Sequence, residues 1–247
     1  MKTSLYILFS AILFIAACES QKFDYSAEMT DASGTGGSLA RFTISDNYLF
    51  TVDASKLKTF DITNEENPQL IGEVELEWGI ETIFALGDLL FLGAQNGVYI
   101  FDISDPASPQ YLSLYSHIQS CDPVVVKDNY AYSTLNSSGP CSQGLNQLDI
   151  IDISDPVNPS QVKSLPMESP RGLGISGTLL FVCDEGLKVF NLTDPVKPEF
   201  LSTIQIDAFD VIPIDTLLLV ATEQGLSEYS IDDDNQIQFI SSIYSQQ

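Results

Sequence analysis

The chain repeats one short pattern five times, and the clearest copy reads Phe101-Asp102-Ile103-Ser104-Asp105-Pro106-Ala107-Ser108-Pro109. The other copies are residues 60–68 (FDITNEENP), 151–159 (IDISDPVNP), 190–198 (FNLTDPVKP) and 229–237 (YSIDDDNQI). The second residues of successive copies lie 41, 50, 39 and 39 positions apart. A period near 40 residues in a chain rich in strand formers is typical of a β-propeller or a similar array.

Each copy lies inside a longer unit that the sequence predicts to hold four short strands. Two runs of apolar and β-branched residues come first, as in residues 83–91 (IFALGDLLF) and 173–181 (LGISGTLLF). The two residues that join the first run to the second are of Asp-Asn, Gly-Asp, Gly-Thr or Asp-Thr type, which is typical of tight hairpins. A third strand ends in the pattern and a fourth follows its second proline. We therefore expect antiparallel strands and hardly any helix.

The pattern itself is predicted to be a turn. Asp105-Pro106 suits a turn because proline fixes φ at the second turn position and aspartate accepts bonds from nearby backbone N–H groups. Pro109 lies where a strand begins, a place that tolerates proline. We therefore interpret the repeated aspartates as turn residues rather than as metal ligands, and we expect no bound metal or cofactor.

The predicted architecture is an all-β, five-bladed β-propeller of four-stranded antiparallel blades spanning residues 39–247. One unit cannot bury both of its faces, whereas a closed ring of units covers those faces and protects the edge strands. Six blades are the alternative, with the sixth built from the N-terminal segment, where Phe23-Asp-Tyr-Ser26 could add a strand.

Residues 1–17 read as a signal peptide, with Lys2 followed by the apolar run Leu5 to Ile15, too short to span a bilayer permanently. The segment ends in Ile15-Ala16-Ala17-Cys18, which resembles the bacterial lipobox. The resemblance implies that Cys18 becomes the lipidated first residue, carrying acyl chains such as palmitate that anchor it stably. An ordinary signal peptide with an incidental cysteine is the alternative. Residues 18–38 then form a flexible tether rich in glycine and serine.

The chain carries a formal net charge of −24. Such a carboxylate excess argues against nucleic acid as a partner, because binding phosphates needs a basic surface. It also argues against docking on anionic lipid head groups. We interpret it as a solvated acidic surface that keeps the protein soluble; affinity for cations or for a basic partner is the alternative.

The repeat as a whole resembles the LVIVD repeat family. The likeness lies in the Leu-Phe-Val type run, the Tyr-Phe-Asp-Ile type run and the Ser-Asp-Pro-x-x-Pro turn, and it extends over residues 40–245. The resemblance implies a propeller of a secreted or surface protein of bacteria. It implies no defined catalytic activity and supplies no catalytic residue. The fifth copy departs most, since it lacks Asp-Pro and has Asp232-Asp233-Asp234-Asn235. This acidic turn could weakly bind a cation, although it lacks EF-hand spacing.

Three cysteines remain beyond Cys18. Cys121 lies just before the first strand of the third unit, and Cys141 lies in an insertion, residues 136–147, that lengthens the same unit. The two connections emerge on one face of a blade, so we predict a Cys121–Cys141 disulfide. We expect Cys183, within a strand, to be a free buried thiol.

The candidate site residues lie at the channel mouth, the end of the propeller where loops lead into the innermost strand of each blade. Such loops usually form the binding face. These residues are Arg41, Trp78, Glu81, Asp122, Arg171 and Asp210. They would form a mixed charged rim; the alternative is that they cap the strands and meet water. The single tryptophan could stack on a sugar or anchor a partner, or it could pack between blades.

From these features we predict a lipid-anchored propeller of the cell envelope, on the outer membrane, acting as a non-enzymatic binding or protein-interaction module. The partner would be an envelope protein or a glycan. One alternative is a carbohydrate-active enzyme, which requires two carboxylates a few ångströms apart at the channel mouth. The other is a purely structural envelope protein. Fold alone does not choose among them.

Overall fold

The computed structural model describes residues 38–53, 55–77, 79–117, 123–137 and 145–245. These residues form five four-stranded antiparallel sheets, each made of consecutive strands, and they contain no helix. The predicted all-β, five-bladed propeller is confirmed. Nothing in this part of the chain is a helix that could cross a membrane. The signal peptide, Cys18 and the tether up to residue 37 lie outside the described ranges.

The strand boundaries follow the repeat. Blade 1 comprises β1 (Phe42–Ser45), β2 (Tyr48–Val52), β3 (Lys56–Asp61) and β4 (Gln69–Glu75). Blade 2 comprises β5 (Ile80–Leu86), β6 (Leu89–Ala94), β7 (Gly97–Asp102) and β8 (Gln110–Ser116). Blade 3 comprises β9 (Val124–Lys127), β10 (Tyr130–Leu135), β11 (Gln147–Asp152) and β12 (Ser160–Pro166). Blade 4 comprises β13 (Leu173–Ser176), β14 (Leu179–Cys183), β15 (Leu187–Asn191) and β16 (Glu199–Ile204). Blade 5 comprises β17 (Ala208–Ile214), β18 (Leu217–Thr222), β19 (Gly225–Ile231) and β20 (Ile237–Tyr244).

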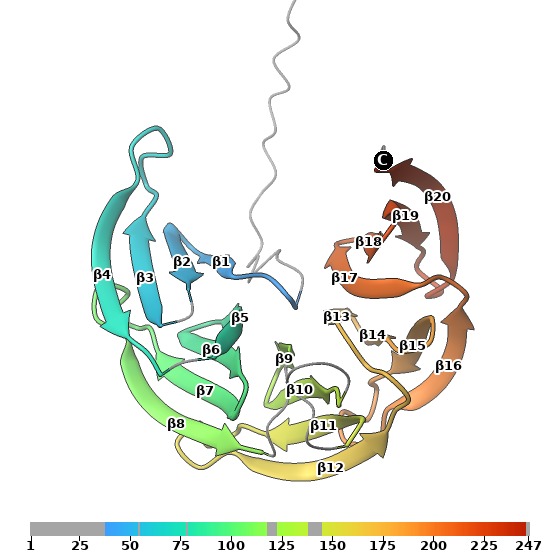
Figure 1. Cartoon of the computed structure of the whole chain (residues 1–247), viewed down its shortest axis with the longest axis horizontal. Helices are drawn as coiled ribbons and strands as arrows, with labels where there is room; N and C mark the ends of the chain where they lie inside the picture. Colours follow the sequence, from blue (N-terminus) through green and yellow to red (C-terminus); the bar gives the residue numbers. More distant parts are fainter. Residues whose placement is uncertain (1–37, 54, 78, 118–122, 138–144, 246–247) are drawn as a thin grey trace, which may run out of the picture. The chain divides into compact units, whose positions relative to one another are not determined.

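The blades follow one another around a common centre, with the first strand of each blade innermost and the fourth outermost (Figure 1). Neighbouring blades meet through their inner strands: β1 contacts β5, β5 contacts β9, β9 contacts β13 and β13 contacts β17. Among the described residues, Glu81 and Asp210 lie within the inner strands β5 and β17, and Arg41 and Arg171 shortly precede β1 and β13.

The hairpins between the first and second strands share one backbone conformation. The first turn residues, Asp46, Gly87, Asp128, Gly177 and Asp215, all have φ between 50 and 55°. This left-handed geometry suits a two-residue hairpin turn, and glycine and aspartate tolerate it better than most residues. The sequence prediction of five hairpins is confirmed.

The core lies between blades rather than inside one. We call the face of a blade that packs against the following blade its leading face, and the opposite face its trailing face. Leading-face residues Phe50 and Leu57 of blade 1 pack with trailing-face residues Leu90 and Leu92 of blade 2. The three further junctions between consecutive blades are built in the same way. Burial of these apolar faces is the main favourable term holding the blades together.

The repeated pattern does form the predicted turn. The carboxylate of Asp102 accepts a hydrogen bond from the backbone N–H of Ser104 at 2.8 Å, and Asp152 does the same with Ser154 at 2.8 Å. These bonds favour the ionised form and lower the pKa of both aspartates. The structure therefore gives these carboxylates a local backbone role.

The turns also join neighbouring blades. Ser113 of β8 donates to the carbonyl oxygen of Pro156 at 2.6 Å, and Tyr132 of β10 donates to the carbonyl oxygen of Pro195 at 3.0 Å. Both acceptors belong to the repeated turn of the following blade. The pattern thus serves inter-blade packing as well as its own turn.

We expect Tyr132→Phe to lower the free energy of unfolding by about 1 kcal/mol, because the fully buried ring stays packed while its hydrogen bond to Pro195 is lost. Urea denaturation measures the change. Tyr130→Phe, on the same strand but partly exposed, is the matched control and should change stability less. An equal loss in both variants would show that the inter-blade bond contributes nothing.

The predicted state of Cys183 is confirmed: it is a free thiol with 0% exposure, and burial raises its pKa. Cys121 and Cys141 lie outside the described residues, so their disulfide stays a prediction.

Candidate functional site

The inner strands position four of the six channel-mouth residues. Arg41 directly precedes β1, Glu81 is the second residue of β5, Arg171 lies two residues before β13, and Asp210 is the third residue of β17. All four lie where the chain enters the innermost strand of a blade. Trp78 and Asp122 lie outside the described residues.

Asp210 is the most buried of these groups, with 7% exposure. Its carboxylate accepts a hydrogen bond from the hydroxyl of Ser38 at 3.0 Å and further bonds from backbone N–H groups of Ser38, Leu39 and Val211. Removal from water is the larger influence and raises the pKa of Asp210, against the opposing hydrogen bonds. The oxygens of this carboxylate are therefore occupied by the chain itself.

Ser38, which lies just before blade 1, contacts blades 4 and 5, which are far from it in sequence. It is 2% exposed, and its hydroxyl oxygen also accepts from the backbone N–H of Leu173 at 2.8 Å. Two residues later, the carbonyl oxygen of Ala40 accepts from the N–H of Ile83 at 3.1 Å. Residues 38–40 thus contact β13 and β17 at one end and β5 at the other. Serine at a tether boundary gave no sequence signal for this role.

Gly172 makes room for the buried carboxylate. A Cβ atom on this residue would lie 2.7 Å from Cα of Asp210 and 2.8 Å from the carbonyl oxygen of Phe209. The N–H of Gly172 donates to that same carbonyl at 3.0 Å. Blades 4 and 5 therefore approach each other backbone to backbone at the channel mouth, which only glycine permits.

The remaining charged groups of the mouth are more exposed. Arg171 approaches Asp207 with 3.7 Å between Nη1 and Oδ1, and their side chains are 44% and 81% exposed. Glu81 accepts from the side-chain amide of Gln95 at 3.2 Å. Arg41 is exposed. Within the described ranges no hydrogen bond or ion pair joins Arg41, Glu81 and Arg171 to one another, so they form a rim rather than a cluster.

A buried ion pair supports the loop that leads to Arg171. The carboxylate of Asp184 is 0% exposed and lies 2.7 Å from Nζ of Lys188. It also accepts from the backbone N–H groups of Glu168 at 3.1 Å and Ser169 at 2.6 Å. Burial alone would raise the pKa of Asp184, but Lys188 and the two N–H groups prevail and lower it. No sequence motif marks this pair.

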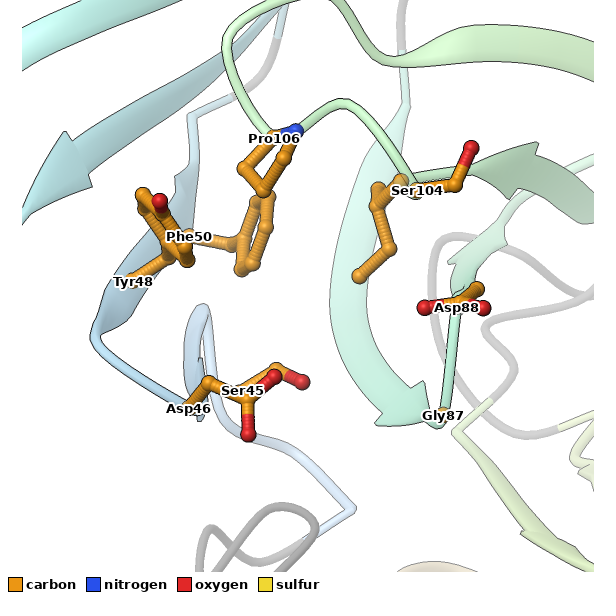
Figure 2. Close-up of a pocket in the computed structure, with 9 residues that line it drawn as sticks. Ser45, Asp46, Tyr48, Phe50, Gly87, Asp88, Ser104 and Pro106 are labelled. Carbon is orange, nitrogen blue, oxygen red and sulfur yellow. The ribbon is translucent and has the colours of Figure 1, made fainter.

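A second site lies at the hairpin end of blades 1 and 2, away from the channel mouth. It is a pocket of about 220 Å³ between the β1–β2 turn, the β5–β6 turn and the repeated turn of blade 2. Figure 2 shows Asp46 on the β1–β2 turn and Asp88 on the β5–β6 turn, with Ser104 and Pro106 on the repeated turn of blade 2. The exposed lining of the pocket is mainly polar. No group of three or more His, Cys, Asp or Glu side chains able to hold a metal ion occurs in the part of the chain that the structure describes.

We expect the stability of Asp210→Asn relative to the natural chain to increase as the pH rises from 4 to 8. The raised pKa means that the aspartate's contribution is full below its unfolded-state pKa and is lost as the pH rises through its folded-state pKa. Asparagine cannot ionise and escapes this loss. Thermal unfolding at several pH values tests it. Asp207→Asn, at an 81% exposed position, is the control, and a parallel pH dependence in both variants would contradict the assignment.

Sequence comparison supports the repeat type. The sequence model of the LVIVD repeat matches residues 36–75, 81–116 and 142–165. These segments cover blade 1, most of blade 2 and the second half of blade 3. The chain is therefore a β-propeller in which three segments match the LVIVD repeat model. A search of curated proteins found no match.

Structure comparison supports the fold alone, because the identities are low. A protein from Lactobacillus plantarum matches with a TM-score of 0.64 and 14% identity over 79% of this chain and 67% of that one. A functionally unknown protein from Desulfotomaculum acetoxidans matches with a TM-score of 0.64 and 10% identity, over 83% of this chain and 69% of that one. The periplasmic gluconolactonase of Pseudomonas aeruginosa matches with a TM-score of 0.58 and 14% identity, over 80% of this chain and 67% of that one. About a third of each of these chains has no counterpart here.

Proposed function

We propose that this chain is a non-enzymatic binding module of the cell envelope whose channel mouth binds an envelope protein or a glycan. The observation that carries the proposal is the chemistry of the mouth. Exposed charges of both signs, Arg41, Arg171 and Asp207, stand on or beside rigid inner strands. Such a rim can recognise a partner of complementary charge, because fixed charges confer orientation and specificity.

The state of the carboxylates favours binding over acid–base catalysis. Hydrolysis of a glycan needs two carboxylates that face a shared space. Asp210 has the raised pKa expected of a general acid, but its oxygens bond to Ser38 and to backbone N–H groups. Glu81 is engaged by Gln95.

The proposed location rests on the N-terminal sequence. The lipobox-like segment that ends at Cys18 would anchor the protein to a bacterial membrane, which we place at the outer membrane. Residues 19–37 would separate the propeller from the lipid surface. The channel mouth would then be available to neighbouring envelope components.

A pull-down from envelope extracts tests this proposal. The bait is residues 19–247, compared with the variant Arg41→Ala/Glu81→Ala/Arg171→Ala. We expect at least about a tenfold loss of the captured partner, because the rim charges would be removed from the centre of the interface. Asp210 is left unchanged because it holds Ser38 in place.

The matched control is Lys163→Ala/Lys197→Ala/Glu199→Ala. It removes the same number of charges of each sign from the outer part of blades 3 and 4. Retention with the control and loss with the mouth variant supports the proposal. Equal capture by all three baits would show that the channel mouth is not the binding surface.

A further inference from the structure

The middle strands of the first and last blades are buried on one face only. In β14 all five residues are buried, and in β6 and β10 all but the first are. In β2 and β18 buried residues alternate with partly exposed ones. The exposed residues are those of the trailing face of blade 1 and the leading face of blade 5.

Blade 5 shows the difference at matching positions. Phe50, Phe91, Tyr132 and Phe181 occupy the same place on the leading faces of blades 1 to 4, and each is at most 1% exposed. Leu219 occupies that place in blade 5 and is partly exposed. On the outer strand of the same face, Ile243 is 70% exposed, whereas the matching Ile204 of blade 4 packs into the core.

Blade 1 shows the same difference on its trailing face. Phe42 and Ile44 of β1 are 54% and 41% exposed. The matching residues of β5, Ile83 and Ala85, are 3% and 0% exposed, because blade 1 covers them. By analogy with blade 2, the uncovered trailing face of blade 1 would pack against the leading face of another blade.

Nothing among the described residues covers these two faces. Blades 1 and 5 stand at the two ends of the series in Figure 1, and no strand of one is in extensive contact with a strand of the other. Contiguous apolar surface that stays uncovered often marks a site of protein association.

We propose that the uncovered faces of blades 1 and 5 bind a four-stranded β-blade contributed by a partner polypeptide. All four junctions in the chain join a leading face to a trailing face, so the surface that fits blade 5 is the trailing face of another blade. In two solved structures of similar fold, about a third of the chain lies outside the part that matches this protein. A partner blade would supply the missing sheet and would meet both exposed faces at once.

Charge specifies the partner further. Glu228 lies on the leading face of blade 5, where blades 1 to 4 have Thr59, Ile100, Ile150 and Val189. Those four residues are at most 1% exposed. Glu228 accepts from the hydroxyl of Ser241 at 3.0 Å. A blade that covers it requires a lysine or arginine opposite, since an unpaired buried carboxylate is costly.

A second copy of the chain is a weaker occupant. Its blade 1 could cover blade 5 of the first copy, but the outer faces of both molecules would stay uncovered. Such a head-to-tail contact grows into filaments when it does not close. A single inserted blade covers both faces without growth.

The capacity of blade 5 to accept a blade is tested with a blade of known sequence. A copy of residues 168–204, which contain blade 4, is joined to the full chain after Tyr244. We expect the midpoint of thermal unfolding of this fusion to be about 5 °C higher than that of the chain without the added blade. The added sheet would bind only the folded form of blade 5 and would therefore stabilise it, as a ligand does. The control carries Leu180→Glu and Val182→Glu in the added copy only, which places charge on its trailing face. An equal midpoint in both fusions would overturn the proposal.

The natural occupant is tested by photocrosslinking in cells that produce the chain. A photoreactive phenylalanine analogue replaces Ile44 on blade 1 or Ile243 on blade 5, and Tyr111, 56% exposed on β8, provides the control position. We expect one foreign protein, through strand-rich peptides, to crosslink at both face positions and not at the control. Crosslinks to residues 19–37 of the same chain, to a second copy, to different proteins at the two faces, or to nothing would each overturn it.

Discussion

Replacing Asp184 by alanine is expected to lower the free energy of unfolding by about 3 kcal/mol. The carboxylate has no exposure, so its removal leaves Lys188 without its partner inside the fold and leaves the N–H groups of Glu168 and Ser169 unpaired. Breaking a buried pair from one side costs several times more than breaking a surface pair. Urea denaturation with linear extrapolation measures the loss.

The control for Asp184 is Glu73→Ala, which removes one partner of the exposed pair between Glu73 and Lys56. That change should cost far less, because water solvates the remaining lysine. The effect of Asp184→Asn should also depend on pH. The lowered pKa of Asp184 means that its contribution is present above the unfolded-state pKa and is lost as the pH falls through the folded-state pKa. A variant as stable as the natural chain at pH 7 would contradict the assignment.

Gly172→Ala is expected to destabilise the chain by about 2–3 kcal/mol. A methyl group at this position would meet the backbone of Phe209 and Asp210, which cannot rotate away as a flexible side chain could. Blades 4 and 5 would have to separate, and the bond from Gly172 to Phe209 would lengthen. Overpacking against fixed atoms typically costs this much. Thermal and urea unfolding both report it.

Gly177→Ala separates backbone strain from overpacking. Gly177 has a φ of +55° in the β13–β14 turn, and no atom lies within 4 Å of the place its Cβ would take. Alanine there suffers only the cost of the left-handed conformation, about 1 kcal/mol. If both variants lost the same stability, the close approach of blades 4 and 5 would not be the cause. Reduced amide protection around Ser38 should accompany Gly172→Ala alone.

The sequence was sufficient for the architecture because the signals are local and repeated. Turn pairs such as Asp46-Asn47 and Gly87-Asp88 set the hairpins within a few residues of chain. Five copies in similar spacing then reinforced one interpretation. The alternation of apolar residues predicted which strands have a buried face, but it could not predict whether another blade covers that face. The exposed leading face of blade 5 has an apolar pattern like the buried ones.

The channel mouth was predictable only in part. The loops before the inner strands could be located, so Arg41, Glu81, Arg171 and Asp210 were placed at the correct ends of their strands. The partner of Asp210 could not be found, because Ser38 lies 172 residues away in sequence. Gly172 and the pair of Asp184 and Lys188 carry no motif. Their roles arise only when blades that are distant along the chain come together.

Because every described sheet is built from consecutive strands, each blade is complete as soon as its own fourth strand has been synthesised. No blade has to wait for a strand from the opposite end of the chain. Contacts between near neighbours in sequence favour rapid folding, and domains emerging from the ribosome fold from the N-terminus onward. Blade 1 can therefore form while blade 5 is still being translated. The leading face of each folded blade is then available for the next blade to pack against.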